Sequence, residues 1–566
     1  MGTKKGTQPV TEFGKQAAAL VARLTLEEKI GQILLLAFAG PPDVGPRQLI
    51  ERYGLGGVYV SQDNAATPEE AARLSTTLQG YARTTPSAVP LLIAADHEGA
   101  WSVVAPSTTT GPGNLGLGAT HNPRWTEAMY AVLAQELRSV GYNTLLAPCV
   151  DVNSNPRNAI IGMRSFGDDP VAVSAHAAAA VQGAQANGVI AAAKHFPGHG
   201  DTQTDTHRGL AIVDRTAEAV RATDLLPFRA AIGAGVGMVM TSHILYPAFD
   251  AEQPATLSRR VLQGLLREEL GFQGLIISDS MNMASISRVY PPGEAEVQAI
   301  LAGVDMLMLA EEHYAHDHTT YLERQLTIVE RLLEAARSGR LPLSRLDDAV
   351  SRIIKLKLSH GVFNQPSPRP AEARRIVGAA VHRQIASAAA TAGVTLLGAD
   401  NRLLPVAPHV PLTIVNTTSA GAYSILSGTR GIGPNQTVSA FDAFVAACRL
   451  RTPNMLVLSA EEAFQPNGAP SDHVPTVGVV VAVTENYPLP GEDFDTTAQV
   501  PRLLRLQAAV GPRLILVALR DPYDLPRLDP LPTCLCTCSF RPEAAAAAAA
   551  VLFGESPANG RLPVRS

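Results

Sequence analysis

In the stretch Gly188-Val-Ile-Ala-Ala-Ala-Lys-His-Phe-Pro-Gly-His-Gly200, an apolar run passes directly into a segment of ionisable and turn-forming residues. The run up to Ala193 predicts a buried strand, because it is short, continuous and apolar. The segment from Lys194 to His207 then holds three His, two Asp and one Lys. Ionisable side chains at the end of a buried strand are typical of an active-site loop on a rigid scaffold. We therefore expect this loop to carry the chemistry of the protein.

Seven further apolar runs of this kind lie before residue 312, and most of them are separated by segments with helical periodicity. The eight predicted strands are Ile33–Phe38, Gly57–Val60, Leu91–Ala95, Thr144–Ala147, Val189–Ala193, Met238–Thr241, Leu275–Ser278 and Val304–Leu309. Predicted helices between them include Pro68–Tyr81, Trp125–Val140, Pro170–Asn187 and Leu257–Leu270. Strands that alternate with helices pair in parallel through right-handed crossovers. Eight such units over about 300 residues predict a (β/α)8 barrel of the α/β class.

Polar residues follow most of these runs. They are Asp96, His97 and Glu98 after the third run, Asp151 after the fourth, Lys194 and His195 after the fifth, Ser242 and His243 after the sixth, Asp279 after the seventh, and Glu311 and Glu312 after the eighth. The carboxyl ends of barrel strands meet at one mouth, where barrel enzymes react. Any strand must end in something polar, but Asp, His and Lys after four different strands exceed that requirement.

The pattern changes after residue 312. Tyr321–Ala336 and Ser344–Leu358 predict amphipathic helices, and Ser344 is placed to cap the second one. A Pro-rich linker is predicted within residues 366–380, between a barrel domain of residues 1–365 and a second domain of residues 381–566. The strand-like runs of the second domain are Val394–Leu397, Leu412–Asn416, Met455–Ser459, Val477–Thr484, Leu514–Leu519 and Cys534–Ser539. With helices between them, including Glu543–Phe553, they predict a three-layer α/β/α domain.

Charge and hydropathy argue against a nucleic-acid-binding or membrane-spanning protein. The 566 residues carry a net charge of −5 with 46% hydrophobic and 17% charged residues, the composition of a globular protein. A basic stripe is absent from the sequence, so nucleic acid is not an expected partner. The apolar runs are shorter than the roughly 18 residues that cross a bilayer, and the N-terminus does not resemble a signal peptide. We expect a cytoplasmic protein that does not bind membranes, while its oligomeric state is not indicated.

The cysteines do not form a disulfide framework. Five are present, an odd number, at positions Cys149, Cys448, Cys534, Cys536 and Cys538. The last three alternate, which places them on one face of a strand as small apolar side chains. A zinc cluster is the alternative, but no second Cys or His pair lies nearby in the sequence.

Two segments of the chain carry specific motifs. Residues 194–207 read Lys-His-Phe-Pro-Gly-His-Gly, four residues, Asp-Thr-His, and residues 271–281 read Gly-Phe-Gln-Gly-Leu-Ile-Ile-Ser-Asp-Ser-Met. These motifs resemble glycoside hydrolase family 3, in particular its β-N-acetylglucosaminidase branch. The first meets the family pattern Lys-His-(Phe/Ile)-Pro-Gly-(His/Leu)-Gly, four residues, Asp-(Ser/Thr)-His, and the second is similar to the segment that carries the family's nucleophile. Further matches are Ala147-Pro148, Asp151-Val152, Ile161 to Pro170, Pro254 to Ser258, Asp521 to Tyr523, Leu552 to Gly554 and Gly560 to Pro563. The resemblance covers nearly the whole chain.

The resemblance implies that Asp279 is the nucleophile, an ionised carboxylate that attacks the anomeric carbon and holds a covalent glycosyl-enzyme. From the residues alone, Asp279 could instead cap the helix that follows it. The resemblance also implies that His207 is the general acid/base and Asp205 its partner. A His suits this step because it titrates near neutrality, and a carboxylate can fix its tautomer.

The resemblance further implies a set of sugar-binding residues. They are Asp96, Arg164, Lys194 and His195. Fixed donors together with one carboxylate suit the hydroxyl groups of a pyranose ring. The residues alone leave other pairings open, namely Arg164 with Asp168 or Asp169, and Lys194 with Asp151.

One stretch departs from the family pattern. Where the family carries an Arg that binds the sugar, this chain has Val104, and the apolar Trp101 lies close by. A missing guanidinium removes a bidentate donor, so the sugar preference of this region is open. For His199 and His243, packing within a loop and contact with substrate are equally compatible with the sequence.

The function implied is retaining hydrolysis of terminal β-linked N-acetylglucosamine from chito-oligosaccharides or peptidoglycan fragments, as in cell wall recycling. The expected partner is a small carbohydrate, and neither a cofactor nor a metal is expected. Phosphorolysis or β-glucosidase activity at the same site, and an inactive sugar-binding homologue, stay open as alternatives. A metal-dependent hydrolase would use His195, His199, Asp205 and His207, but Pro197 and Gly198 argue against a helical ligand pair.

Overall fold

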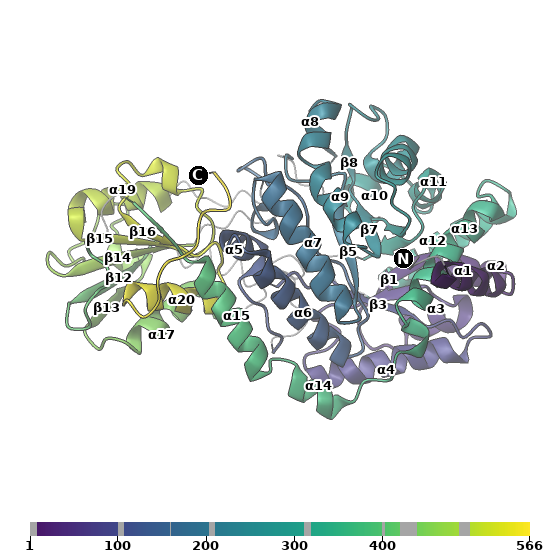
Figure 1. Cartoon of the computed structure of the whole chain (residues 1–566), viewed down its shortest axis with the longest axis horizontal. Helices are drawn as coiled ribbons and strands as arrows, with labels where there is room; N and C mark the ends of the chain where they lie inside the picture. The colour runs from purple at the N-terminus through teal and green to yellow at the C-terminus, as the bar shows by residue number, and fades with distance from the viewer. Residues whose placement is uncertain are drawn as a thin grey trace, which may run out of the picture.

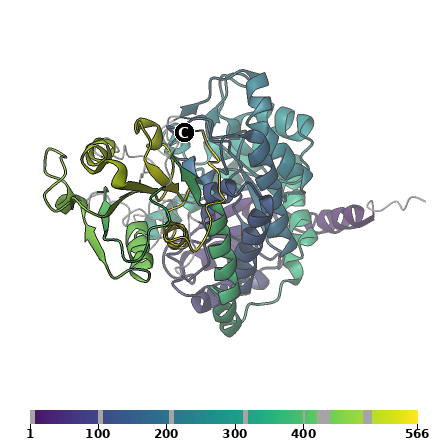
Figure 2. The ribbon, with the colours of Figure 1, turned by 60° about the vertical axis from the view of Figure 1, so that its left-hand side comes forward.

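The structure is a computed structural model, and it describes residues 8–99, 107–158, 160–202, 210–310, 318–398, 402–418, 438–485 and 499–565. Two bodies lie side by side along the long axis of the molecule, and the C-terminus lies between them (Figure 1). The larger body is the barrel and the smaller one carries a second sheet. In Figure 2, α1 (Gln8–Val21) extends from the barrel on the side away from the smaller body.

Eight parallel strands form the barrel, and all eight predicted runs are confirmed as strands. They are β1 (Leu34–Ala37), β2 (Gly57–Tyr59), β3 (Leu92–Ala95), β4 (Thr144–Leu145), β5 (Ile190–Phe196), β7 (Met238–Thr241), β9 (Leu275–Ile277) and β10 (Leu307–Leu309). Their order in the sheet is β10-β1-β2-β3-β4-β5-β7-β9. A parallel bridge between Ile277 and Met306 joins the two ends of this order. The strand β5 is longer than predicted, so Lys194 and His195 belong to the strand and not to the loop after it.

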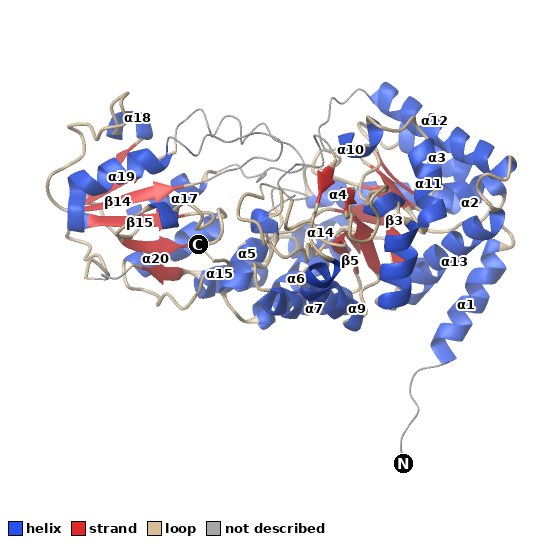
Figure 3. Cartoon of the chain, turned by 90° about the horizontal axis from the view of Figure 1, so that it is seen from above, coloured by secondary structure: helices blue, strands red, loops and turns tan. Residues whose placement is uncertain are grey.

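Helices surround the barrel strands, as Figure 3 shows in blue around red. Besides α1, the helices of this part are α2 (Leu26–Gln32), α3 (Gly45–Tyr53), α4 (Pro68–Thr84), α5 (Gly113–Ala119), α6 (Pro123–Ser139), α7 (Pro170–Ala186), α8 (Ala217–Ala222), α9 (Leu225–Gly233), α10 (Ala284–Ser287), α11 (Glu294–Ala302), α12 (His318–Arg337) and α13 (Leu343–Ser359). The predicted helix Leu257–Leu270 is present as a π-helix, η3 (Arg260–Glu269). The prediction that Ser344 caps α13 is wrong, because Pro342 occupies the cap position and Ser344 lies inside the first turn.

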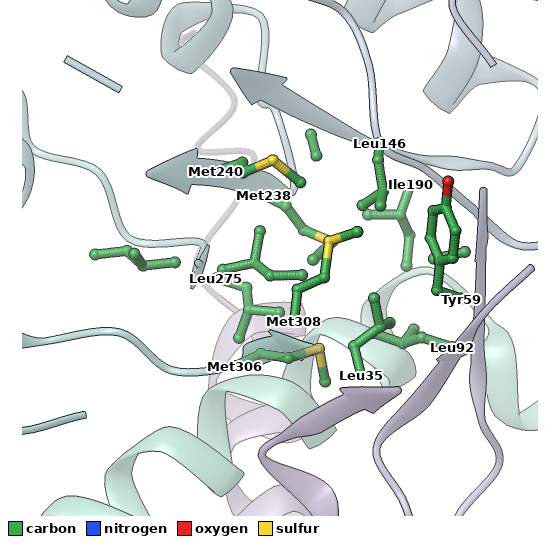
Figure 4. Close-up of a cluster of buried hydrophobic side chains, with 14 of the residues drawn as sticks. Leu35, Tyr59, Leu92, Leu146, Ile190, Met238, Met240, Leu275, Met306 and Met308 are labelled. Atoms are coloured by element: carbon green, nitrogen blue, oxygen red, sulfur yellow. The ribbon is translucent and has the colours of Figure 1, made fainter. Parts of the chain in front are cut away.

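The interior of the barrel is filled by apolar side chains from its strands. Figure 4 labels Leu35, Tyr59, Leu92, Leu146, Ile190, Met238, Met240, Leu275, Met306 and Met308, and all ten are buried. Strand β7 alone contributes two methionines. Unbranched thioether side chains fill irregular gaps between branched neighbours. The core is therefore packed and closed, and the polar strand ends above it rest on a rigid support.

The second sheet has six strands in the order β11-β16-β15-β14-β12-β13. They are β11 (Thr395–Leu397), β12 (Leu412–Asn416), β13 (Met455–Leu458), β14 (Val479–Thr484), β15 (Leu514–Ala518) and β16 (Thr533–Cys536). The helices of this body are α17 (Ala440–Arg449), α18 (Ala460–Ala463), α19 (Gln499–Val510) and α20 (Pro542–Leu552).

The chain leaves β12 and β14 in opposite directions across this sheet, so right-handed crossovers place α17 and α19 on opposite faces. The predicted α/β/α layers are thus confirmed. Strand β11 pairs antiparallel to β16, and the other pairs are parallel. We call this body, from β11 to α20, the C-terminal domain.

The connection between the two bodies is helical. Within the stretch predicted as a Pro-rich linker lies α14 (Pro370–Ile376), followed by α15 (Ala380–Gly393). Helix α15 contacts α5 and α6 of the barrel and α20 of the C-terminal domain. The domain limits given above remain a prediction.

The chain enters and leaves the C-terminal domain at one point. The backbone N–H of Gly560 donates to the carbonyl of Val394 at 2.9 Å, and the next residue, Arg561, donates to Ala119 in α5 at 2.9 Å. A Cβ atom on Gly560 would lie 2.3 Å from the Gly393 carbonyl oxygen, which is too close. Glycine is therefore required where these backbones meet.

The five cysteines are free and buried. The Sγ atoms of Cys536 and Cys538 lie 3.7 Å apart at the end of β16. Their burial agrees with the prediction that they act as small apolar side chains. Among the described residues, no helix combines the length and the apolar character needed to cross a membrane.

Candidate active site

Four of the five predicted site residues that the structure describes lie at the carboxyl ends of barrel strands, and the fifth, Arg164, lies in the loop after β4. Asp96 follows β3 directly, and Lys194 and His195 lie in the last part of β5. Asp279 follows β9 after one intervening serine. Because these strands are parallel members of one sheet, their carboxyl ends open on the same mouth.

A buried ion cluster joins two predicted cations through one carboxylate, that of Glu98. The guanidinium of Arg164 donates to both oxygens of Glu98, from Nε and from one terminal nitrogen, each at 2.9 Å. Nζ of Lys194 lies 2.7 Å from Oε1 of Glu98 and 2.5 Å from Oδ1 of Asp96. The Asp96 side chain is 14% exposed, more than any of its three partners in this cluster. The cluster is therefore neutral in sum, with Asp96 as its most accessible member.

The opposite charges in this cluster stabilise one another's ionised forms. Burial alone would raise the pKa of the Glu98 carboxyl, but Arg164 and Lys194 hold it well below its usual range. Burial would lower the pKa of Lys194, but Asp96 and Glu98 raise it above its usual value. Glu98, Lys194 and Arg164 thus stay ionised at neutral pH, and each depends on its partners for compensation.

Asp151 organises the start of the loop after β5. Its Oδ2 lies 2.8 Å from Nδ1 of His195, and its Oδ1 accepts the backbone N–H of His199 at 2.7 Å. The Sγ–H of Cys149 also points to Oδ2, at 3.1 Å. Burial would raise the pKa of Asp151, but the neighbouring His195 contributes to a net lowering. A buried carboxylate with several donors is a rigid anchor for the imidazole beside it.

His195 lies between the Glu98 ion cluster and Asp151, and it contacts both. Its Nε2 lies 3.3 Å from a terminal nitrogen of Arg164, which can only donate. Its Nδ1 faces Asp151 on the other side. These two contacts fit the tautomer with the proton on Nδ1, so that Nε2 accepts from Arg164.

The alternative pairings that the sequence left open for Arg164 and Lys194 are wrong. Both cations pair with Glu98, and Asp151 pairs with His195 instead. Asp169 accepts from the second residue of α7 and caps that helix. Asp168 accepts from a backbone N–H next to the C-terminus, at 2.8 Å.

His199 and His243 both make contacts that stabilise loops. Nδ1 of His199 lies 2.8 Å from the Thr202 hydroxyl. Burial lowers the pKa of His199 to about 4, so this imidazole is neutral at physiological pH. The ring of His243 contacts Thr256 from Nδ1 and the Ser280 carbonyl oxygen from Nε2, each at 2.9 Å. His243 therefore holds the residue that follows Asp279.

The backbone around Asp279 is firmly held. The N–H of Ser280 donates to Oδ1 of Asp279 at 2.7 Å. The Ser280 side chain donates to the carbonyl of Ala310, and Met281 N–H donates to Met308 at 2.9 Å. The segment that carries Asp279 is thus fixed to β10, while its carboxylate is partly exposed. The side chain does not serve mainly as a helix cap, because α10 begins five residues later and Met283 occupies its cap position.

Six residues of the sequence argument lie outside the described residues. They are Trp101, Val104, Asp205, His207, Glu311 and Glu312. The roles assigned to His207 and Asp205, and the effect of Val104 on sugar preference, therefore stay predictions.

A metal site is not favoured by the described part of the chain. The group there with ligand-like spacing is Cys149, Asp151 and His195. All three are buried and joined by the hydrogen bonds described above. Burial raises the pKa of the Cys149 thiol well above its usual value, so the protonated thiol can donate to Asp151. Hydrogen bonding explains this group without an ion.

Sequence reasoning missed two features of the site. It did not assign Glu98 to the site, and it did not predict that Asp151 pairs with His195. Glu98 lies two residues after Asp96, directly after a predicted strand, so position alone could have suggested it. Charge balance was the further signal, because Arg164 and Lys194 in one buried site require more than one carboxylate.

Comparisons with known proteins agree with this architecture. The glycosyl hydrolase family 3 N-terminal domain matches residues 25–356. A protein named beta-hexosaminidase A from Pseudoalteromonas piscicida is 29% identical over 97% of this chain and 98% of its own length. A beta-N-acetylglucosaminidase/beta-glucosidase from Cellulomonas fimi is 32% identical over 75% of this chain and 73% of its own. The solved structure of a family 3 beta-N-acetylglucosaminidase from Paenibacillus sp. str. FPU-7 has a TM-score of 0.81 and 30% identity, covering 96% of this chain and 99% of that one.

The chain belongs to glycosyl hydrolase family 3. It is therefore an enzyme of the glycosidase class, with a barrel and a second α/β domain.

Proposed function

We propose that this enzyme removes terminal β-linked N-acetylglucosamine from short saccharides with retention of configuration. The observation that carries the proposal is the cluster of Lys194, Arg164 and Asp96 on the same barrel mouth as Asp279. Cations held by a shared carboxylate, beside one accessible carboxylate, suit the hydroxyl groups of a pyranose ring. The names of the relatives in Pseudoalteromonas and Paenibacillus support the choice of sugar.

In the proposed first step, a carboxylate oxygen of Asp279 forms a bond to the anomeric carbon as the bond to the leaving oxygen breaks. That oxygen takes a proton from His207, whose charge Asp205 stabilises. In the second step, His207 removes a proton from water, whose oxygen attacks the anomeric carbon and frees Asp279. Two inversions at one carbon give net retention.

A β-glucosidase activity is the second candidate. The name of the Cellulomonas relative joins both activities, and this relative is 32% identical to the chain. The stretch around Val104, which departs from the family pattern, lies where a sugar-binding Arg is expected. One missing donor weakens discrimination between two sugars that differ only at the 2-position.

The test is turnover of matched 4-nitrophenyl β-glycosides, the N-acetylglucosaminide against the glucoside, each with and without inorganic phosphate. We expect kcat/KM for the N-acetylglucosaminide to exceed that for the glucoside by at least tenfold, with free sugar as product in both buffers. Proton NMR of the first product should show the β-anomer. A preference for the glucoside would replace the substrate proposal, and sugar 1-phosphate in phosphate buffer would replace hydrolysis by phosphorolysis. A first product with the α-configuration would contradict the covalent mechanism.

A further inference from the structure

The C-terminal domain contacts the long barrel loop that holds Asp151 and Arg164. We call residues 146–169, between β4 and α7, the β4–α7 loop. Its last part is fixed by the C-terminal tail, because the N–H of Asp168 donates to the carbonyl of Pro563 at 3.0 Å. Two side chains of the C-terminal domain, Arg520 and Tyr523, reach the loop closer to the sugar-binding residues.

Tyr523 forms a direct hydrogen bond to this loop. Its hydroxyl oxygen accepts from Nδ2 of Asn153 at 2.5 Å, and Asn153 is only 2% exposed. Asn153 lies two residues after Asp151, which anchors His195. Burial raises the pKa of Tyr523 above its usual value, so the phenol stays protonated and neutral beside the amide.

Arg520 contacts the same loop at its other end. Its Nε lies 2.9 Å from the Sδ of Met163, and the guanidinium is 3% exposed. Met163 precedes Arg164 directly, in the short helical turn η1 (Gly162–Arg164). Its side chain packs with Leu115 and Ala119 into the hydrophobic core of the C-terminal domain. The backbone of Arg164 is therefore set in part from outside the barrel.

A shift of the β4–α7 loop would also displace residues of the loop that follows β5. Asn158 of this loop donates to the carbonyl of His199 at 2.7 Å, and Asn155 donates to that of Asp201 at 3.2 Å. These carbonyls belong to the loop that continues toward His207. A domain contact at Asn153 is thus connected to His195 and to the loop that follows β5 through the backbone of the β4–α7 loop and the hydrogen bonds of Asp151, Asn155 and Asn158.

We infer that Tyr523 is a positioning residue, which holds the β4–α7 loop so that Arg164 and His195 bind the sugar. The inference rests on the proposed function. It gives the C-terminal domain a part in substrate binding without a contact to the reacting atoms. An interface that served only to attach the two domains would stabilise the protein and leave the affinity for the sugar unchanged.

The test compares Tyr523→Phe with Thr452→Val in the full chain. Tyr523→Phe removes only the hydroxyl that accepts from Asn153. Thr452→Val removes a hydroxyl that donates to the carbonyl of Pro408 inside the C-terminal domain, at 2.7 Å and away from the barrel. We expect Tyr523→Phe to raise KM for the 4-nitrophenyl N-acetylglucosaminide about tenfold and to change kcat less than twofold. Thr452→Val should leave both constants unchanged at a similar Tm.

A double-mutant cycle with Asn153→Ala isolates the hydrogen bond. If the contact acts as inferred, Asn153→Ala alone raises KM, and adding Tyr523→Phe raises it little further. Additive effects of the two substitutions, or a KM in Tyr523→Phe equal to that of Thr452→Val, would overturn the inference.

Hydrogen exchange followed by mass spectrometry gives a readout that does not need turnover. Peptides that cover residues 151–169 should exchange faster in Tyr523→Phe than in Thr452→Val. An inactive wild-type enzyme would refute the proposed function, and this measurement would still decide whether Tyr523 holds the loop. Unchanged exchange in these peptides would contradict the inference in either case.

Discussion

Two buried ion networks lie at opposite ends of the same barrel, and they differ in how charge is distributed. At the mouth, Glu98 and Asp96 compensate Arg164 and Lys194. At the base, the buried carboxylate of Asp305, just before β10, is surrounded by three arginines, and two of these also pair with the exposed Asp348. The contacts of Asp305 are with Arg267 at 2.6 Å, Arg345 at 3.0 Å and Arg352 at 3.6 Å.

Hydrogen bonds to backbone groups complete the base network. Arg267 donates to the carbonyls of Phe272 and Gly274, and Asp305 accepts the N–H of Ile276 at 3.0 Å. It connects the amino-terminal ends of β9 and β10, where barrel residues serve stability. The mouth network has the same types of residue, but its partly exposed carboxylate, Asp96, directly follows the carboxyl end of β3. Position along the strands, and not the presence of a buried ion pair, is therefore the reason to propose sugar binding at the mouth and a structural role at the base.

The largest expected effect is on activity, at the mouth. Asp279→Ala should lower kcat by about 10⁴-fold or more, because the proposed covalent intermediate forms on this carboxylate. Its Tm should stay close to that of the wild type, since the Asp279 side chain is partly exposed. Steady-state kinetics with 4-nitrophenyl N-acetylglucosaminide and thermal unfolding measure both. The control is Asp472→Ala, an exposed aspartate of the C-terminal domain. Near-normal turnover in Asp279→Ala would refute its role as nucleophile.

Glu98→Ala should lower both activity and stability. It leaves Arg164 without its carboxylate and Lys194 with Asp96 alone, all in a buried site. Breaking one partner of a buried ion pair costs about 4 kcal/mol, so we expect a clear loss in the free energy of unfolding and in kcat/KM. Glu98→Gln keeps the shape and should show a smaller loss. A variant Glu98→Ala with wild-type KM would mean that the cluster does not bind the sugar.

Asp305→Ala should lower stability without lowering the activity of the folded enzyme. The substitution leaves the buried Arg267 without its carboxylate and costs about 3 kcal/mol. Chemical denaturation and kinetics below the unfolding transition test this directly. If kcat fell as strongly as in Glu98→Ala, the distinction between the two networks would fail.

The smallest expected effect is the pH dependence set by Lys357, a fully buried residue whose Nζ lies 2.9 Å from Oε1 of Gln32. Burial lowers the pKa of Lys357 to about 7. Between this value and the ordinary one near 10.4, the unfolded chain binds the proton and the folded chain does not, so stability rises with pH in this range. Below pH 7 both states are protonated and the destabilisation is complete.

Lys357→Met should remove this rise in stability with pH. The stability difference between the variant and the wild type should change by about 2 kcal/mol between pH 8.5 and pH 10. Denaturation midpoints across this range measure it. Lys355→Met on the same helix is the control, and an equal change of slope there would show that Lys357 is not the group responsible.

The sequence predicts the strands of this protein well, because each is a short apolar run between polar segments. It fails where the outcome depends on neighbours in space. The antiparallel direction of β11 and the π-helix of η3 leave no local signal. The cap of α13 was misplaced because Pro342, with its fixed φ, starts that helix before Ser344.

For the site, strand ends and the family resemblance point to Asp96, Lys194, His195 and Asp279, and the structure places all four on one mouth. The partners could not be predicted, because carboxylates and cations that meet in space are far apart in sequence. Arg164 and Glu98 are separated by 66 positions. The contact of Tyr523 with Asn153 spans 370 positions and two domains, and only the fold reveals it.

The meeting of Gly393 and Gly560 gives the C-terminal domain the topology of an insertion. Its entry and exit points are joined by the hydrogen bond between Gly560 and Val394, so a cut there leaves two chain ends only a few ångströms apart. Residues 395–559 could be excised and the gap closed by a few residues, with Arg561 still bonded to α5. Such a minimal enzyme would keep the tail and lose Tyr523, which would separate the contributions of these two attachments.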